Sequence, residues 1–113
     1  MTERWRIRLT DAAEQDFLRI LKDTLETFGE RQALVYRATL LEALAALDTG
    51  PEVPGSSARD DLRPCLRSLH VARRGRRGRH VIIYRAVGEK IIDVVRVLHD
   101  AMDFVRHVPP EST

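Results

Sequence analysis

Apolar and polar residues alternate near the amino terminus and then change to a helical spacing. Between Arg4 and Leu9 every second side chain is apolar, which is the period of a strand with one buried face. Thr10 and Asp11 are both residue types that cap helices, and after them apolar side chains recur every three or four positions. They are Ala13, Phe17, Ile20, Leu21, Leu25 and Phe28. The pattern predicts a strand followed by a helix that ends near Gly29.

A second amphipathic segment runs from about Arg31 to Leu47. The connection before it is so short that the two helices should form an antiparallel hairpin. Its apolar surface has two stripes: Ala33, Tyr36, Leu40, Leu44 and Leu47, and then Leu34, Ala38, Leu41 and Ala45. Two interpretations remain open, because the second stripe either packs inside the fold with the first or binds a partner.

The second half of the chain predicts strands. The segment from Asp48 to Pro64 is rich in glycine, proline and serine and has no periodicity, so we expect a surface loop. Three segments rich in branched and apolar residues then follow: Cys65–Ala72, His80–Val87 and Ile91–Leu98. Their glycine-containing connections favour hairpins, so these strands should form an antiparallel meander.

After the last strand, Asp100 is a candidate cap for a short helix whose Met102, Phe104 and Val105 face inward. Pro109 and Pro110 would end this helix.

Together these elements predict an α+β fold in the order β-α-α-β-β-β with a short C-terminal helix. The helical hairpin should pack on one face of a mostly antiparallel four-stranded sheet and leave the other face to solvent or a partner. The 113 residues are 43% hydrophobic and 32% charged, as in ordinary folded domains. We therefore expect a single domain over 1–113, with about 109–113 as a flexible tail.

Cysteine and apolar content limit the possible chemistry and location. Cys65 is the only cysteine, and the four histidines show no zinc-type spacing with it, so we expect a reducing compartment and no metal. No apolar run reaches the roughly 18 residues that span a bilayer, and no signal-peptide pattern begins the chain. The sequence therefore predicts a cytoplasmic protein without a membrane partner.

The basic residues are almost all arginine, and many lie between Arg59 and Arg85 although the net charge is only +2. Because guanidinium groups pair with carboxylates and phosphates, the connection from Arg73 to Arg79 suggests an acidic protein partner or nucleic acid. A solvated loop tip explains the same residues equally simply.

Arg96 lies in an otherwise apolar strand, where strict alternation would place it on one face with Ile92, Val94 and Leu98. A buried guanidinium needs a partner, so we expect an ion pair with Asp103 or Asp16, unless that face is a functional surface.

His99 stands where the last strand gives way to the final helix. We expect its ring to fix this turn through a backbone carbonyl or Asp103, and its pKa of about 6.5 also suits general acid–base chemistry.

Four segments, in order along most of the chain from Trp5 to His107, resemble toxins of the RelE/ParE superfamily. They are Leu9, Thr10, Ala13 and Asp16; Phe28, Gly29, Ala33 and Tyr36; His80 to Arg85; and Ile92 to Asp103. The last segment contains Arg96, Val97, Leu98, His99, Met102 and Asp103, which is similar to the R-V-L-H-x-x-M-D ending of ParE-like members.

This resemblance implies the toxin of a type II toxin–antitoxin system, which inhibits DNA gyrase by protein–protein binding and is not an enzyme. It also implies a ParD-like antitoxin as the neutralising partner, contact with DNA only through that antitoxin, and no cofactor. The antitoxin-binding residues would be Leu34, Ala38, Leu41, Arg67, Arg73 and Arg85. The residues for toxicity or target binding would be Arg96, His99, Met102 and Asp103.

The alternative within the superfamily is a RelE-like ribosome-dependent mRNA endoribonuclease, with Arg67, Arg85, Arg96 and His99 as its catalytic residues. The chain departs from that pattern, since the loop from Asp48 to Pro64 has no lysine and no tyrosine follows Tyr84. A DNA-binding or structural protein that uses the arginine-rich connection is a third and less favoured interpretation.

Overall fold

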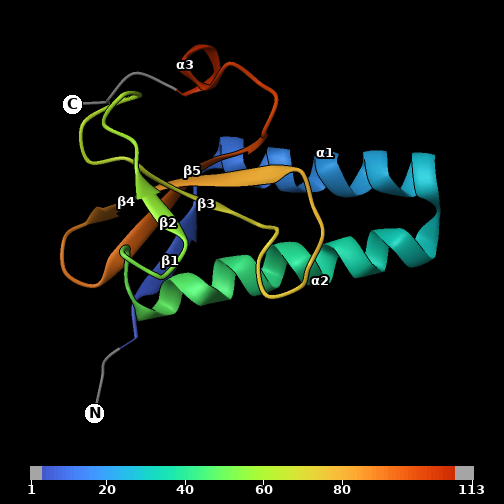
Figure 1. The fold of residues 1–113 in the computed structure, drawn as a ribbon, viewed down its shortest axis with the longest axis horizontal. Coiled ribbons are helices and arrows are strands. Elements are labelled where there is room, and N and C mark those ends of the chain that lie inside the picture. Colours follow the sequence, from blue (N-terminus) through green and yellow to red (C-terminus); the bar gives the residue numbers. More distant parts are fainter. Residues whose placement is uncertain (1–3, 109–113) are drawn as a thin grey trace.

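Two long helices pack on one face of a five-stranded sheet in the computed structural model, which describes residues 4–108 (Figure 1). In chain order the elements are β1 (Arg6–Leu9), α1 (Asp11–Phe28), α2 (Glu30–Ala46), the short 3₁₀ helix η1 (Leu47–Thr49), β2 (Ser56–Ala58), β3 (Arg67–His70), β4 (His80–Val87), β5 (Ile91–His99) and α3 (Phe104–His107). The strand order is β1-β5-β4-β3-β2. Among the strands of residues 4–108, only β1 and β5 pair in parallel, so the predicted α+β class and mostly antiparallel sheet are confirmed. The predicted tail over 109–113 lies outside the described residues.

The prediction of four strands is wrong, because β2 lies inside the segment expected to be a loop. Its residues, Ser56–Ala58, are exposed or half-buried and show no apolar alternation. They form a strand because they pair antiparallel with β3, where Ser56 lies opposite Leu69. The Arg67 guanidinium also donates to the Ser56 hydroxyl at 2.8 Å. Tertiary pairing therefore creates a strand that local propensity does not indicate.

The predicted helical hairpin is confirmed, with a single residue between its helices. Thr10 caps α1, since its hydroxyl accepts the Ala13 N–H at 3.1 Å. Gly29 joins α1 to α2 at a φ of +92°, a conformation that side chains disfavour. Its N–H donates to the Leu25 carbonyl, which closes the last turn of α1.

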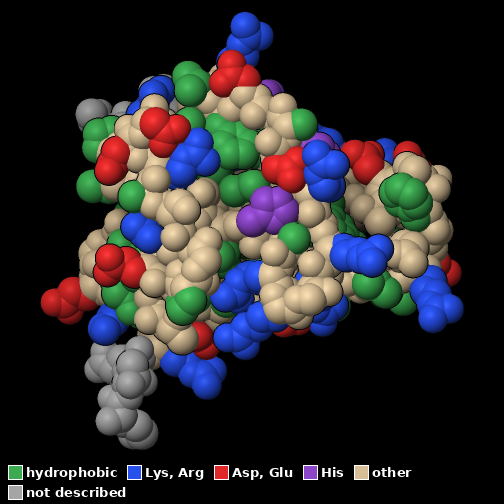
Figure 2. Space-filling view, in the orientation of Figure 1, with side chains coloured by type: hydrophobic (Ala, Val, Ile, Leu, Met, Phe, Trp, Pro, Cys, Tyr) green, Lys and Arg blue, Asp and Glu red, His purple; other side chains and the backbone are tan. Residues whose placement is uncertain are grey.

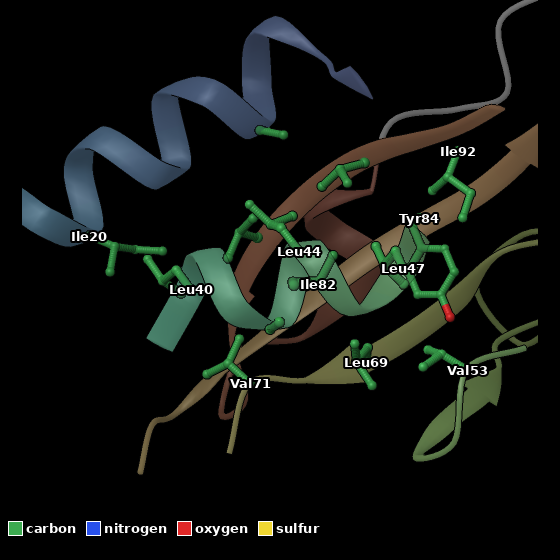
Figure 3. Packing of buried hydrophobic residues seen from close by; sticks show 14 residues of the cluster. Ile20, Leu40, Leu44, Leu47, Val53, Leu69, Val71, Ile82, Tyr84 and Ile92 are labelled. Carbon is green, nitrogen blue, oxygen red and sulfur yellow. The ribbon is translucent and has the colours of Figure 1, made fainter. Parts of the chain in front are cut away.

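The main core lies between the hairpin and the sheet (Figure 3). Its larger members from α2 and η1 are Leu40, Leu44 and Leu47, which pack with Leu69, Ile82 and Tyr84 of the strands. The second stripe of α2 is not in this core, because Leu34 is 62% exposed and Leu41 is 39% exposed. Figure 1 shows the reason for the exposed apolar residues near the turn, since this end of the hairpin projects beyond the sheet. Phe28 there is 70% exposed.

The other sheet face is covered, contrary to the expectation that solvent or a partner would meet it. A second apolar cluster forms there from Leu62, Leu66, Val81, Ile83, Val95, Leu98 and Val108, with Phe104 against it. The residues before β3 and the C-terminal segment supply its outer layer. The Arg59 guanidinium lies 5.2 Å from the centre of the Phe104 ring, which adds a cation–π contact to this cover.

An irregularity in β5 breaks the predicted alternation around Arg96. Ile83 pairs with Arg96 and the next residue, Tyr84, pairs with Val94, so Val95 is an extra residue in β5. As a result Val97 joins Val94 in the core under the helices, whereas Leu98 lies with Val95 in the second cluster. The expectation that Leu98 shares a face with Val94 is wrong for the same reason.

Beyond the end of β1, a side chain of helix α1 binds the edge of β5. β1 ends at Leu9, opposite Val94, so the later N–H groups of β5 have no strand partner on that side. The Asp16 carboxylate accepts the Val97 N–H at 3.0 Å and two bonds from Arg96 at 2.7 and 2.8 Å. A third Arg96 nitrogen donates to the His107 carbonyl at 2.7 Å. Of the two expected partners of Arg96, the structure therefore selects Asp16.

This ion pair is well shielded, since Asp16 exposes 4% and Arg96 19% of their side chains. The hydrogen bond to Asp16 raises the pKa of Arg96. Asp103, the alternative partner, instead lies 3.6 Å from Arg106 on the surface.

We predict that Arg96→Ala lowers the free energy of unfolding by about 3 kcal/mol, because it leaves Asp16 buried without its cation. Asp16→Ala should lower the free energy of unfolding by a similar amount. The loss in the double variant should be smaller than the sum of the two single losses by about 1–3 kcal/mol. Urea unfolding measures all three values. The exposed pair Arg8–Asp93, at 2.8 Å, provides the control, and its coupling should be much smaller because solvent screens it. Equal couplings for the two pairs would contradict the prediction.

Candidate functional site

Two hollows meet at the end of the sheet where β4 begins and β5 ends. The larger, of about 770 Å³, lies between the hairpin and the β3–β4 connection. The smaller, of about 440 Å³, lies between α1, β5 and the segment after β5. His80 and His99 line both hollows, and they are directly opposite each other in the β4–β5 pairing.

The larger hollow, called the groove below, has an apolar wall and a basic rim. The wall contains Phe28, Val35 and Tyr36, and the rim contains Arg76, Arg77 and Arg79. No acidic residue lines the groove among the residues that the structure describes. Figure 2 shows basic side chains gathered around the β3–β4 connection, with a histidine at the surface beside them.

Two of the three rim arginines have acidic partners just outside the groove. Arg76 pairs with Glu42 at 2.8 Å, and Arg79 pairs with Asp100 at 3.0 Å. For Arg77 no ion pair is found within residues 4–108. The rim therefore keeps a net positive charge.

Tyr36 connects the hairpin to β4 at the back of the groove. Its hydroxyl lies 2.6 Å from His80 Nδ1 and accepts the Arg79 N–H at 3.2 Å. Gly78 makes this approach possible, since an added Cβ would lie 2.8 Å from the Tyr36 oxygen and 2.7 Å from a Val71 methyl carbon. The aromatic ring is thus held between α2 and the β3–β4 connection.

Asp100 joins β3, β4 and the end of β5. Its carboxylate accepts bonds from Arg79 at 3.0 Å and from His70 Nε2 at 3.0 Å. These two donors lower the pKa of Asp100 to about 2. The prediction that Asp100 caps the final helix is wrong, because its side chain is used here and α3 begins only after Asp103.

His99 fixes the turn after β5, as expected, but through a different partner. Its Nδ1 accepts the Ala101 N–H at 3.1 Å, rather than bonding a carbonyl or Asp103. The His99 ring also meets the His80 ring edge-on, with 5.4 Å between their centres. Burial, together with the charge that His99 can carry, lowers the pKa of His80 to about 4.

The predicted antitoxin-binding residues divide into an exposed stripe and arginines used inside the fold. Leu34, Ala38 and Leu41 are all on the exposed side of α2. Arg67 donates to the Pro51 carbonyl at 2.9 Å, and Arg73 donates to the Pro54 carbonyl at 3.2 Å. Arg85 is half-buried on β4, opposite Asp93.

The structure brings together three of the four residues predicted for toxicity. Arg96, His99 and Met102 line the smaller hollow, whereas Asp103 does not. Met102 is 44% exposed, so the expectation that it faces inward is wrong. Val105 is also exposed, and only Phe104 of the three residues expected to face inward packs against the second apolar cluster.

The four residues of the ribonuclease alternative are not gathered at either hollow. Arg96 and His99 line the smaller one, but Arg67 and Arg85 line neither. Within residues 4–108, no three histidine, cysteine, aspartate or glutamate side chains are grouped so that they could hold a metal ion. In the same range, no helix has the length and apolar character needed to cross a membrane.

The sequence-based prediction missed the network of Tyr36, His70, Arg79 and His80. A signal for part of it exists, because His80 and His99 begin and end two strands joined by a short turn. In a hairpin, residues at similar distances from the turn lie opposite each other. Tyr36 and His70 contact residues that are distant in the sequence, so no comparable pattern in the sequence predicts their contacts.

Two comparisons with known proteins show the family of this chain, and a third shows that its fold is shared. The family described as "ParE toxin of type II toxin-antitoxin system, parDE" matches residues 7–104. Toxin ParE1 of Mycobacterium tuberculosis, in strains CDC 1551 / Oshkosh and H37Rv, is 35% identical over 103 residues, which cover 91% of this chain and 97% of that protein. A solved structure titled "Chromosomal ParDE TA system from P. aeruginosa" has the same fold, with a TM-score of 0.61 and 21% identity over 84% of this chain and 95% of that one.

The lowered pKa of His80 predicts a pH-dependent stability. The folded protein binds a proton at His80 only near pH 4, whereas the unfolded chain binds it near 6.5. The unfolded state therefore carries more protons between these values, and the stability should fall as the pH is lowered from 6.5 towards 4. His80→Asn removes the titrating group and keeps an acceptor for Tyr36, so urea midpoints should change less over this range. His107→Asn is the control, and an equally flat profile for that variant would contradict the assignment to His80.

Proposed function

The chain belongs to the ParE toxin family of type II toxin–antitoxin systems, and from this we propose that it inhibits DNA gyrase by binding to it rather than by catalysis. Its proposed site of action is the cytoplasm, and no cofactor is needed for an inhibitor that works by binding. A ParD-like antitoxin is the proposed neutralising partner, and contact with DNA occurs only through that antitoxin.

The observation that carries the choice of binding over catalysis is the position of Arg96. RNA cleavage needs a cation free to stabilise charge on the phosphate. Arg96 instead directs three nitrogens to Asp16 and the His107 carbonyl. Arg67 is likewise held by the Pro51 carbonyl and Ser56. Because their guanidinium groups are already hydrogen-bonded within the fold, a structural role is favoured for these two arginines. This supports inhibition by binding to the target.

The exposed stripe of α2 supports a protein partner on the hairpin. Leu34, Ala38 and Leu41 lie on a helix face that the rest of the chain leaves open. Exposed apolar patches of this kind are typical of interaction sites. We assign this stripe to the antitoxin, and we assign the rim of the smaller hollow, with His99 and Met102, to the target.

Purified protein should reduce the supercoiling of relaxed plasmid by gyrase in a dose-dependent way. Met102→Ser should weaken the inhibition several-fold, because Met102 lines the smaller hollow. Val105→Ser is the matched control, since Val105 on α3 is also exposed but lines neither hollow. Full gyrase activity at saturating protein, or ribosome-dependent cleavage of mRNA after induction, would reject the proposal.

The antitoxin assignment predicts a difference between two exposed leucines. Leu34→Gln should weaken binding of a ParD-like protein encoded beside this chain by about tenfold or more, because a buried leucine contributes about 1.5–3 kcal/mol. Leu18→Gln, at a leucine of similar exposure on α1, is the control. Calorimetric titration measures both affinities, and equal losses would refute a site on the α2 stripe.

A further inference from the structure

The two histidines between β4 and β5 that line the smaller hollow each have a ring N–H without an acceptor. Nδ1 of His99 accepts the Ala101 N–H at 3.1 Å. The Tyr36 hydroxyl accepts the Arg79 N–H, so its own proton is available for Nδ1 of His80. In each neutral ring the proton therefore lies on Nε2. For these two Nε2 atoms, no hydrogen bond is found within residues 4–108.

Helix α1 brings an acceptor to the same hollow. Asp16, Ile20 and Asp23 are three or four residues apart, so they lie on one side of α1, and all three line the hollow. The Asp16 carboxylate is used by the Arg96 guanidinium and the Val97 N–H. For the Asp23 carboxylate, no hydrogen bond or ion pair is found in the described part of the chain. Among the described residues, the hollow therefore offers a free acceptor as well as two free donors.

The charges around the hollow favour a neutral ligand. Apart from the histidines, its charged side chains are Arg19, Arg96, Asp16 and Asp23, and their charges sum to zero. His80 adds no charge near pH 7, because burial lowers its pKa to about 4. A carboxylate in the hollow would be repelled by Asp23. An ammonium group has no acceptor lone pair for the two ring N–H groups.

The size and walls of the hollow suit a single side chain with an apolar stem. Its volume is about 440 Å³, within the range of small-ligand pockets, and Ile20, Val97 and Met102 are among the apolar residues that line it. A carboxamide is a neutral group that has both a carbonyl acceptor and N–H donors. Glutamine carries this group on a longer apolar stem than asparagine does. Its side chain therefore matches both the polar groups and the walls of the hollow.

From this arrangement we propose that the smaller hollow anchors a glutamine side chain of the target protein. The carboxamide oxygen accepts from the Nε2–H groups of His80 and His99, and the carboxamide nitrogen donates to Asp23. The inference rests on the proposed function in one respect, since it takes the target as the source of this side chain. It gives the site a selectivity for a neutral amide that Met102 at its rim does not supply, because a thioether is only a weak acceptor.

The test uses the full chain and a small probe, N-acetyl-glutamine N-methylamide. Two matched probes contain glutamate, which is charged, or norleucine, which has no polar group. A ligand of this size should bind with a Kd on the order of 1 mM. In long-range ¹H–¹⁵N NMR spectra the glutamine probe should shift the Nε2 signals of His80 and His99 and bind about tenfold more tightly than either matched probe. His70, which binds Asp100 and lines neither hollow, should keep its signals in place.

A pair of variants on α1 locates the acceptor. Asp23→Ala removes the carboxylate, so it should weaken binding of the glutamine probe about tenfold and reduce its advantage over the glutamate probe. The same variant should weaken the inhibition of gyrase several-fold. Glu26→Ala is the control, because Glu26 is an exposed acidic residue of the same helix that lines neither hollow. Both positions are exposed, and urea unfolding shows that each variant folds.

Equal binding of the three probes, or unshifted Nε2 signals of His80 and His99, would overturn the inference. Equal losses in Asp23→Ala and Glu26→Ala would also overturn it, and so would tighter binding of uridine at the same signals. Failure of the proposed function gives a different result, because gyrase would then stay active while the preference for the glutamine probe persists. Inhibition of gyrase without any preference among the probes would reject the inference alone.

Discussion

The ion pair of Asp16 with Arg96 is the contact on which the arrangement of this molecule depends. β1 is only four residues long and ends at Leu9, so on the edge of β5 that faces β1 about half of the strand has no strand partner in the described residues. The Asp16 carboxylate fills this gap by accepting the Val97 N–H while it holds the Arg96 guanidinium. Through the His107 carbonyl the same guanidinium also holds the C-terminal segment. One buried carboxylate thus connects the hairpin, the sheet and the cover of the second sheet face.

The placement of the two hollows follows from this contact and from the length of the hairpin. Because α1 crosses the end of β5, the histidine pair lies at the boundary between helix and sheet. Because both helices extend beyond the strands, the apolar residues near Gly29 have no sheet to cover them (Figure 1). The exposed surfaces of the molecule are therefore consequences of its topology. An interaction protein with a small core can expose apolar residues on the part of the hairpin that the fold does not bury.

Hydrophobic periodicity predicted the elements that have a strong pattern of their own. The hairpin, β4, β5 and the class of the fold were all predictable, because the period of their apolar residues differs between helix and strand. β2 was not, since three small residues become a strand only by pairing with β3. The covered second face had a signal that was missed: Val81 to Tyr84 is a continuous apolar run, and such runs are typical of strands buried on both faces. The network around Asp100 depends on contacts between distant segments, so no local pattern reveals it.

The segment from Arg96 to Asp103, which resembles the ending of ParE toxins, combines residues with different structural roles. For this reason it identifies the family more clearly than it identifies a functional site. Arg96 holds Asp16, and Val97 and Leu98, as successive residues of a strand, belong to opposite apolar clusters. His99 uses one nitrogen for the turn and keeps the other for the hollows. Met102 and Asp103 are exposed. A short motif can therefore specify a fold with its first residues and expose its last ones for binding. Only the exposed residues of such a motif can be substituted to fit a different partner without a change in the fold.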